Sequence, residues 1–177
     1  MFSIGDSFIY GNNGICKLIG IQDMTVWEET RSYYVLKPVF QTNSTVFVSI
    51  GNEKAETRMR KLLSVEEILT LVKGMPDEET VWIDNKNERK ELYRQILAEG
   101  DRSSLIRLIK TVYLHEQKLK TIGKKLHISD EQFMKEAEKV LYDEFAYVLG
   151  IKREEVLPFI LAQIEEYRID KGGEDYV

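Results

Sequence analysis

The spacing of the apolar residues changes at Ser64. Before it, short runs rich in Val, Ile, Phe, Tyr and Thr alternate with turn residues, which is typical of strands. After it, apolar residues recur at helical spacing, as in Leu105, Leu108 and Val112. A chain divided in this way folds as a β part followed by an all-α part. We therefore predict a multi-domain α+β protein.

The β part is too small for a sandwich of two full sheets. Its strand-like runs are residues 7–10, 15–23, 31–40 and 45–50. A strongly curved SH3-like or Tudor-like barrel accommodates four or five such strands. Gly11-Asn12-Asn13-Gly14 predicts a turn, and Pro38 predicts an edge position or a bulge because proline cannot donate to a ladder. The expected domains are 1–63 (the barrel), 64–170 (about five helices) and 171–177 (a flexible tail).

Capping residues predict where the helices begin and end. Ser64 and Ser129 each open a capping-box pattern, and Asp84 is the expected N-cap of a helix that runs to about residue 99. Gly74 is the expected left-handed end of the first helix. Pro158 predicts the start of the last helix or a kink in it.

The 177 residues carry a net charge of −5, but the charge is distributed unevenly. The net charge is +1 over residues 1–63, −5 over 64–85, +6 over 86–125 and −7 over 126–177. A basic block inside an acidic chain is either a local site for a polyanion or a solvated helical face. The sequence has no apolar run long enough for a transmembrane helix and no signal-peptide pattern, so we expect a cytoplasmic protein without membrane contact.

No constellation of catalytic or metal-binding residues can be assembled from the sequence. Cys16 lies in an apolar strand far from any histidine and is expected to be a buried, inert thiol. His115 and His127 have no metal-ligand spacing and are expected at the surface. The acidic run 77–79 is expected to be a solvated loop. We therefore predict a protein that is not an enzyme and needs no metal or cofactor.

Trp82 and the cations that follow it are the strongest candidates for a binding site. One reading is an apolar wedge that stacks on bases, with Lys86, Arg89, Lys90 and Arg94 holding phosphates. The other reading is a core anchor at the domain boundary, with a solvated basic face behind it. The exposure of the Trp82 ring discriminates between the two.

The sequence resembles the CarD/CdnL family of bacterial transcription regulators from residue 2 to about residue 151. In the β part, the matching residues are Phe2, Ile4-Gly5-Asp6, Tyr10, Gly14, Tyr34-Val35-Leu36-Lys37, Thr45-Val46-Phe47-Val48, Arg58 and Arg60. In the helical part, they are Trp82, Gly100-Asp101, Ala137-Glu138-Lys139-Val140-Leu141 and Glu144. The same β module occurs in transcription-repair coupling factors, but this chain has no room for their helicase.

The resemblance implies a regulator that docks on the RNA polymerase β subunit through its β domain. Its helical domain is then expected to contact upstream promoter DNA and to stabilise the open complex. The implied polymerase-binding residues are Met24, Thr25, Val26 and Phe47. The implied DNA-binding residues are Trp82, Lys86, Arg89, Lys90, Arg94, Lys124 and Lys125.

Three further expectations follow from the resemblance and the charge. DNA binding by the isolated protein should be weak and largely independent of sequence, since the basic block is small. The protein is expected to be a monomer that reaches the nucleoid through the polymerase. Some relatives carry arginines at Met24 and Phe47, so docking here would be more apolar. The alternative is a protein–protein adaptor without DNA contact.

Overall fold

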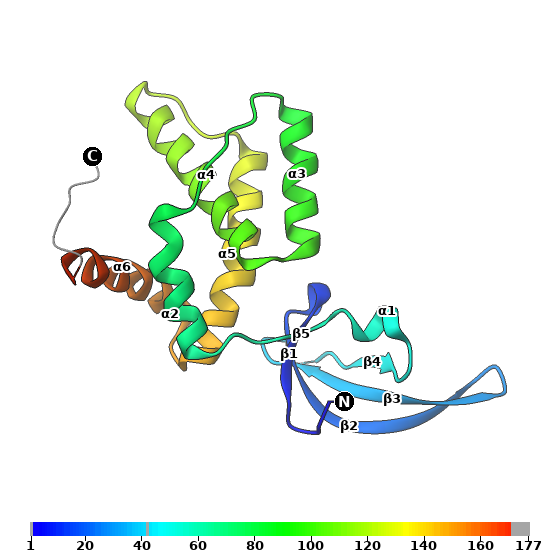
Figure 1. Ribbon diagram of the computed structural model, residues 1–177. Coiled ribbons are helices and arrows are strands. Elements are labelled where there is room, and N and C mark those ends of the chain that lie inside the picture. The colour runs from blue at the N-terminus through cyan, green and yellow to red at the C-terminus, as the bar shows by residue number, and fades with distance from the viewer. Residues whose placement is uncertain (1, 42, 171–177) are drawn as a thin grey trace. The chain divides into compact units, whose positions relative to one another are not determined.

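The computed structural model describes residues 2–41 and 43–170 (Figure 1). The chain divides into two compact units, Met1–Leu62 and Leu63–Val177. The predicted tail, 171–177, lies outside the described residues. Within the described part of the chain, no helix combines the length and the apolar character that crossing a membrane requires.

The N-terminal unit is an antiparallel sheet. Its strands are β1 (Ser7–Tyr10), β2 (Ile15–Val26), β3 (Glu29–Pro38), β4 (Val46–Ser49) and β5 (Met59–Lys61). Their order in the sheet is β4-β3-β2-β1-β5. The α+β class is confirmed, but β4 and β5 form the two edges of an open sheet, where the sequence predicted a closed barrel.

The two faces of this sheet differ. Phe8, Leu18, Tyr34, Leu36 and Val48 are buried and form most of the core of the unit. Because successive side chains in a strand alternate between faces, the residues between them lie on the opposite face. We call that opposite side the outer face.

The sequence predicted the turn after β1 correctly, but not the position of Pro38. The turn after β1 is confirmed as a short 3₁₀ turn, Gly11–Asn13, with Gly11 at φ 47° and Gly14 at φ 67°. Pro38 does not lie on an edge strand, because β3 pairs with both β2 and β4. It is instead the last residue of β3, beyond Leu36, where the pairing with β4 ends. The short helix α1 (Glu53–Glu56) and strand β5 were not predicted.

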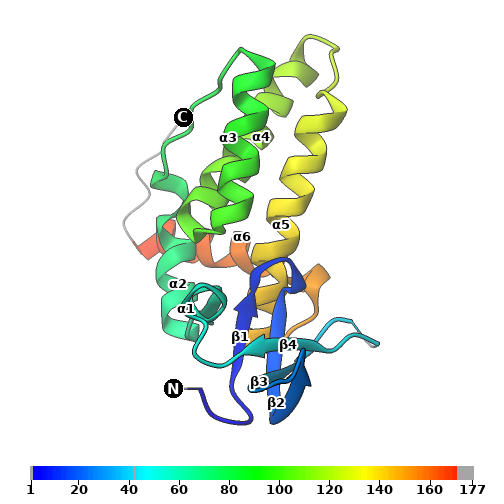
Figure 2. The same ribbon diagram turned by 90° about the vertical axis from the view of Figure 1, so that its right-hand side faces the viewer.

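The C-terminal unit is helical. Its described helices are α2 (Val65–Gly74), α3 (Lys86–Glu99), α4 (Arg102–Thr121), α5 (Ile128–Leu149) and α6 (Arg153–Asp170), with a 3₁₀ turn at Met75–Asp77. Pro158 lies inside α6 and does not start it. Figure 2 shows α3 beside α5, and α4 also packs against α5.

Three of the predicted caps need correction and one is confirmed. The Ser64 capping box is present, with reciprocal bonds between Ser64 and Glu67. Gly74 is in the right-handed region at φ −81°, because the helix continues directly into the 3₁₀ turn. Asn85, not Asp84, caps α3. His127, not Ser129, caps α5, and its ring nitrogen accepts from the Ser129 N–H.

A buried carboxylate ties the start of the helical unit to its centre. Glu144 is almost fully buried in α5 and accepts from the Leu63 N–H at 2.9 Å. It also accepts two bonds from Arg102, at 3.1 and 2.7 Å. These partners compensate the desolvation of the carboxylate, which would otherwise be costly. The segment before α2 is thereby fixed to α4 and α5.

Candidate protein- and nucleic-acid-binding surfaces

The outer face of the sheet brings three of the predicted polymerase-binding residues onto one side. Phe47 is opposite Val35 in the β3–β4 pairing, and Met24 and Val26 are opposite Arg31 and Glu29 in the β2–β3 pairing. Because positions 29, 31 and 35 alternate with core positions on β3, all of these residues share the outer face. Phe47 is 43% exposed. The outer face therefore presents exposed apolar side chains to a partner, beside the exposed pair Glu29 and Arg31.

Thr25 lies on the other side of the hairpin. Its hydroxyl is 2.9 Å from that of Thr30, its partner across the hairpin. Val26 and Glu29 flank a two-residue turn and therefore form a hydrogen-bonded pair. The next pair, Thr25 and Thr30, is then a non-hydrogen-bonded pair, in which the backbone N–H and C=O groups of each residue point away from the partner strand. Beyond Lys17, β2 pairs only with β3 among the strands described. The Thr25 backbone therefore faces an open strand edge.

Trp82 is half-buried within the helical unit and is held by two contacts. The His115 ring, from α4, stacks on it with centroids 3.4 Å apart and planes 6° from parallel. The Arg89 guanidinium, from α3, lies 4.2 Å from the indole centroid. Burial lowers the pKa of His115, and the nearby Arg89 charge lowers it further, so the neutral ring is favoured in the stack. The contacts give Trp82 a structural role, and the residue as a whole remains partly exposed.

Arg89 is not available to a phosphate. It is 5% exposed and forms two bonds to the carboxylate of Asp130, at 3.0 and 2.9 Å. Its remaining nitrogen donates to the carbonyls of Ile83 and Asp84. The predicted DNA contact of Arg89 is therefore wrong, because its donors are used to fix the Trp82 loop to α3 and α5. The hydrogen bond with Asp130 raises the pKa of Arg89, so the guanidinium stays charged within the buried pair.

The other predicted DNA-binding cations are exposed or partly exposed. Lys86 starts α3, and its Nζ is 2.6 Å from Nε2 of His127, just before α5. Lys124 and Lys125 are exposed in the loop that precedes His127. Figures 1 and 2 agree that this loop and the start of α3 lie at the same end of the helical unit. We call this region, with Trp82, the basic end.

Lys90 and Arg94 lie farther along α3 than Lys86. Lys90 is partly exposed. Arg94 is well exposed and pairs with Glu91 at 3.3 Å, a surface interaction that solvent weakens. Both cations can reach an external anion, although they are less concentrated than those at the basic end.

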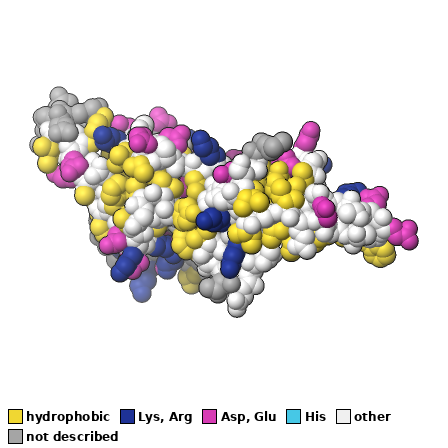
Figure 3. Space-filling model, turned by 90° about the horizontal axis from the view of Figure 1, so that it is seen from below, with side chains coloured by type: hydrophobic (Ala, Val, Ile, Leu, Met, Phe, Trp, Pro, Cys, Tyr) yellow, Lys and Arg dark blue, Asp and Glu magenta, His cyan; other side chains and the backbone are white. Residues whose placement is uncertain are grey.

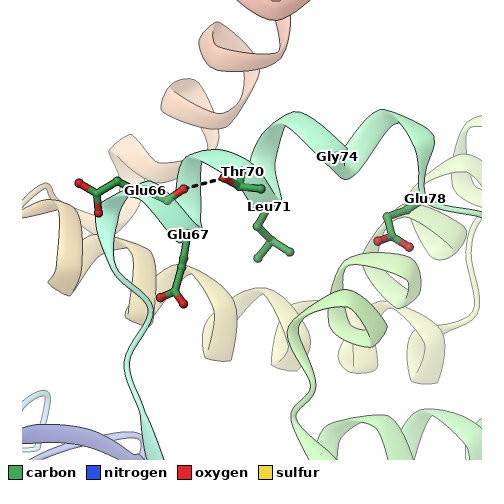
Figure 4. A pocket seen from close by; sticks show the side chains of 6 residues that line it. All are labelled: Glu66, Glu67, Thr70, Leu71, Gly74 and Glu78. Carbon is green, nitrogen blue, oxygen red and sulfur yellow. Dashed lines mark hydrogen bonds between the residues drawn. The ribbon is translucent and has the colours of Figure 1, made fainter.

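Among residues 2–41 and 43–170, the candidate nucleophilic and metal-binding side chains include Cys16 and the carboxylates beside α2. Cys16 is buried, as expected, and this burial raises the pKa of its thiol to about 11. Among the described residues, no group of three His, Cys, Asp or Glu side chains could hold a metal. A hollow beside α2 carries Glu66, Glu67 and Glu78, but Figure 4 shows their carboxylates pointing in different directions. The arrangement suits interaction surfaces.

A comparison with protein families identifies the first unit. The CarD-like/TRCF RID domain, an RNA polymerase-interacting domain, matches residues 2–63. The sheet unit is a CarD-like domain. The match confirms the resemblance seen in the sequence and covers the whole sheet, but it ends where the helical unit begins. A search of curated proteins found no match.

The sequence did not reveal several residues of these surfaces. Asp130 looked like part of a helix cap, and only the fold brings it to Arg89, 41 positions earlier. His115 was expected at the surface, yet it supports Trp82. Trp27 was not singled out, because the tight turn around it has no Asn-Gly signal. Tyr33 and Val35 join the outer face through strand register alone.

We predict that replacing Arg89 destabilises the helical unit. Arg89→Leu leaves Asp130 buried without its partner, which should lower the free energy of unfolding by about 3–5 kcal/mol. Arg94→Leu is the matched control in the same helix, and its loss should stay within about 0.5 kcal/mol because its ion pair is exposed. Urea unfolding of the full chain measures both. Equal stability of the two variants would contradict a structural role for Arg89.

Proposed function

We propose that this CarD-like regulator docks on the RNA polymerase β subunit through the outer face of its sheet and contacts upstream promoter DNA with its helical unit, stabilising the open complex. The observation that carries the proposal is an exposed apolar outer face on a domain whose family interacts with RNA polymerase. Figure 3 shows hydrophobic side chains gathered over the sheet unit.

The docking part of the proposal combines side-chain and backbone contacts. Phe47 lies on edge strand β4, so a partner strand added there would meet both the β4 backbone and the Phe47 ring. Met24 and Val26 extend the same face along the hairpin. An apolar centre of this kind is where binding energy concentrates in protein interfaces.

We predict that Phe47→Ala weakens binding to the β subunit by about tenfold or more, because it removes an aromatic side chain that docking would bury. Phe40→Ala is the matched control, since Phe40 is also well exposed but lies outside the strands. Calorimetric titration with the isolated lobe of the host β subunit measures the two affinities. If both variants bind as the unmodified protein does, the outer face is not the docking surface.

The DNA part of the proposal rests on the basic end. Lys86, Lys124 and Lys125 present charges there, beside an indole that keeps some accessible area. Val81, next to Trp82, is 70% exposed and adds apolar surface. A few cations in a chain of net charge −5 give weak binding to DNA alone. Docking on the polymerase then supplies the effective concentration that weak DNA contacts need.

We predict that Lys124→Gln/Lys125→Gln shortens the lifetime of the open complex and lowers its salt dependence by about two in the log–log slope. The control is Lys139→Gln/Lys152→Gln, which removes the same charge from other exposed positions of the unit. Decay of open complexes after addition of a competitor, measured at several salt concentrations, gives both quantities. A change of slope in the control alone would place the DNA contact elsewhere.

We predict that Trp82→Ala shortens the open-complex lifetime by about 5- to 150-fold, the range expected when one base–indole stacking contact is lost. His115→Ala is the control, because it removes the same ring stack and leaves the indole in place. Decay kinetics and thermal melting are measured for each variant. Equal effects of the two changes would assign Trp82 a structural role only and favour an adaptor without DNA contact.

A further inference from the structure

The tip of the β2–β3 hairpin has an unfavourable backbone for its sequence. Val26 pairs with Glu29, so Trp27 and Glu28 form a two-residue turn. Both have positive φ, 52° and 67°, and they are the described non-glycine residues with this conformation. Asn and Gly are the residues that adopt such a turn easily, whereas a Trp does not. Strain of this kind is often kept where a residue must be presented to a partner.

The Trp27 side chain is also unfavourably placed for a free protein. At 94% exposure it is the most exposed large apolar side chain among the described residues. An indole in water forgoes the stabilisation that its burial would provide. Trp27 therefore combines an unfavourable backbone conformation with an exposed side chain.

The hairpin beneath Trp27 is braced. The hydroxyls of Thr25 and Thr30 lie 2.9 Å apart, and the Ser32 hydroxyl donates to Asp23 at 2.6 Å. Figure 1 shows the β2–β3 hairpin extending beyond the other strands of the sheet. Trp27 is thus presented at the end of an ordered, projecting element, which reduces the entropy lost on binding.

We propose that Trp27 is an anchor that inserts into an apolar pocket of the RNA polymerase β subunit, which deepens the proposed docking function and rests on it. Trp27 directly follows Val26, so it lies at the end of the strand that presents Met24 and Val26 on the outer face. Val26 is itself 49% exposed. Tryptophan is among the residues that most often dominate a protein interface.

The charge of the hairpin indicates a protein partner for Trp27. Residues 22–32 carry a net charge of −2, and Glu28 and Glu29 directly follow the indole. Figure 3 shows acidic side chains around the end of the hairpin. Phosphates would be repelled here, so the indole does not suit stacking on DNA. A protein pocket with a basic rim satisfies both the ring and the carboxylates.

The test uses two substitutions that should act alike on the fold and differently on binding. Trp27→Asn and Glu28→Gly each introduce a residue suited to positive φ, so each should slow hydrogen exchange of the β2–β3 amides by several-fold. Trp27→Asn should weaken binding of the full chain to the isolated β-subunit lobe roughly 30-fold or more, as for loss of an interface anchor. Glu28→Gly should keep most of the affinity, since the indole remains.

Fluorescence gives a second readout. The sequence has two tryptophans, so Trp82→Phe leaves Trp27 as the sole indole. Iodide should quench its emission strongly in the free protein and several-fold less once the lobe is added. Unchanged quenching in the complex, or wild-type affinity of Trp27→Asn while Phe47→Ala is weakened, would overturn the anchor and leave the docking face intact. If the unmodified chain fails to bind the lobe, the proposed function falls first.

Discussion

The buried pair between Arg89 and Asp130 is the interaction on which the helical unit depends. It joins α3 to α5, and through the carbonyls of Ile83 and Asp84 it also holds the loop that carries Trp82. A guanidinium has enough donors to satisfy a carboxylate and two carbonyls at once, which a lysine does not match in geometry. The cost of burying these charges is compensated only while every partner is present.

This pair also determines which cations of the basic block are available to bind an anion. Six cations looked equivalent along the sequence, but one of them, Arg89, has a structural role. Lys86, Lys124 and Lys125 remain at the surface, at the end of the unit where Trp82 is held. The indole is therefore positioned in part by Arg89, a residue that was expected to neutralise DNA beside it. A loop fixed in this way can present an aromatic side chain with little loss of entropy on binding.

In the sheet unit, the main physical constraint is the apolar area that stays exposed to water. Its core is on one face, and the outer face keeps Phe47 and Val26 exposed to water. Exposed apolar area on a sheet with open edges is a risk for aggregation unless a partner covers it. A domain that interacts with RNA polymerase has such a partner. The acidic residues near the hairpin tip limit which surfaces can approach.

The sequence by itself determined the division close to Ser64, the α+β class and the burial of Cys16. These properties follow from periodicity, capping and composition, which act over a few residues. Only the tertiary structure decided which cations are free and which face carries Met24 and Phe47. It also revealed the strained turn at Trp27. Long-range pairing governs these features: Arg89 meets a residue 41 positions away, and one strand register sets every side chain to its face.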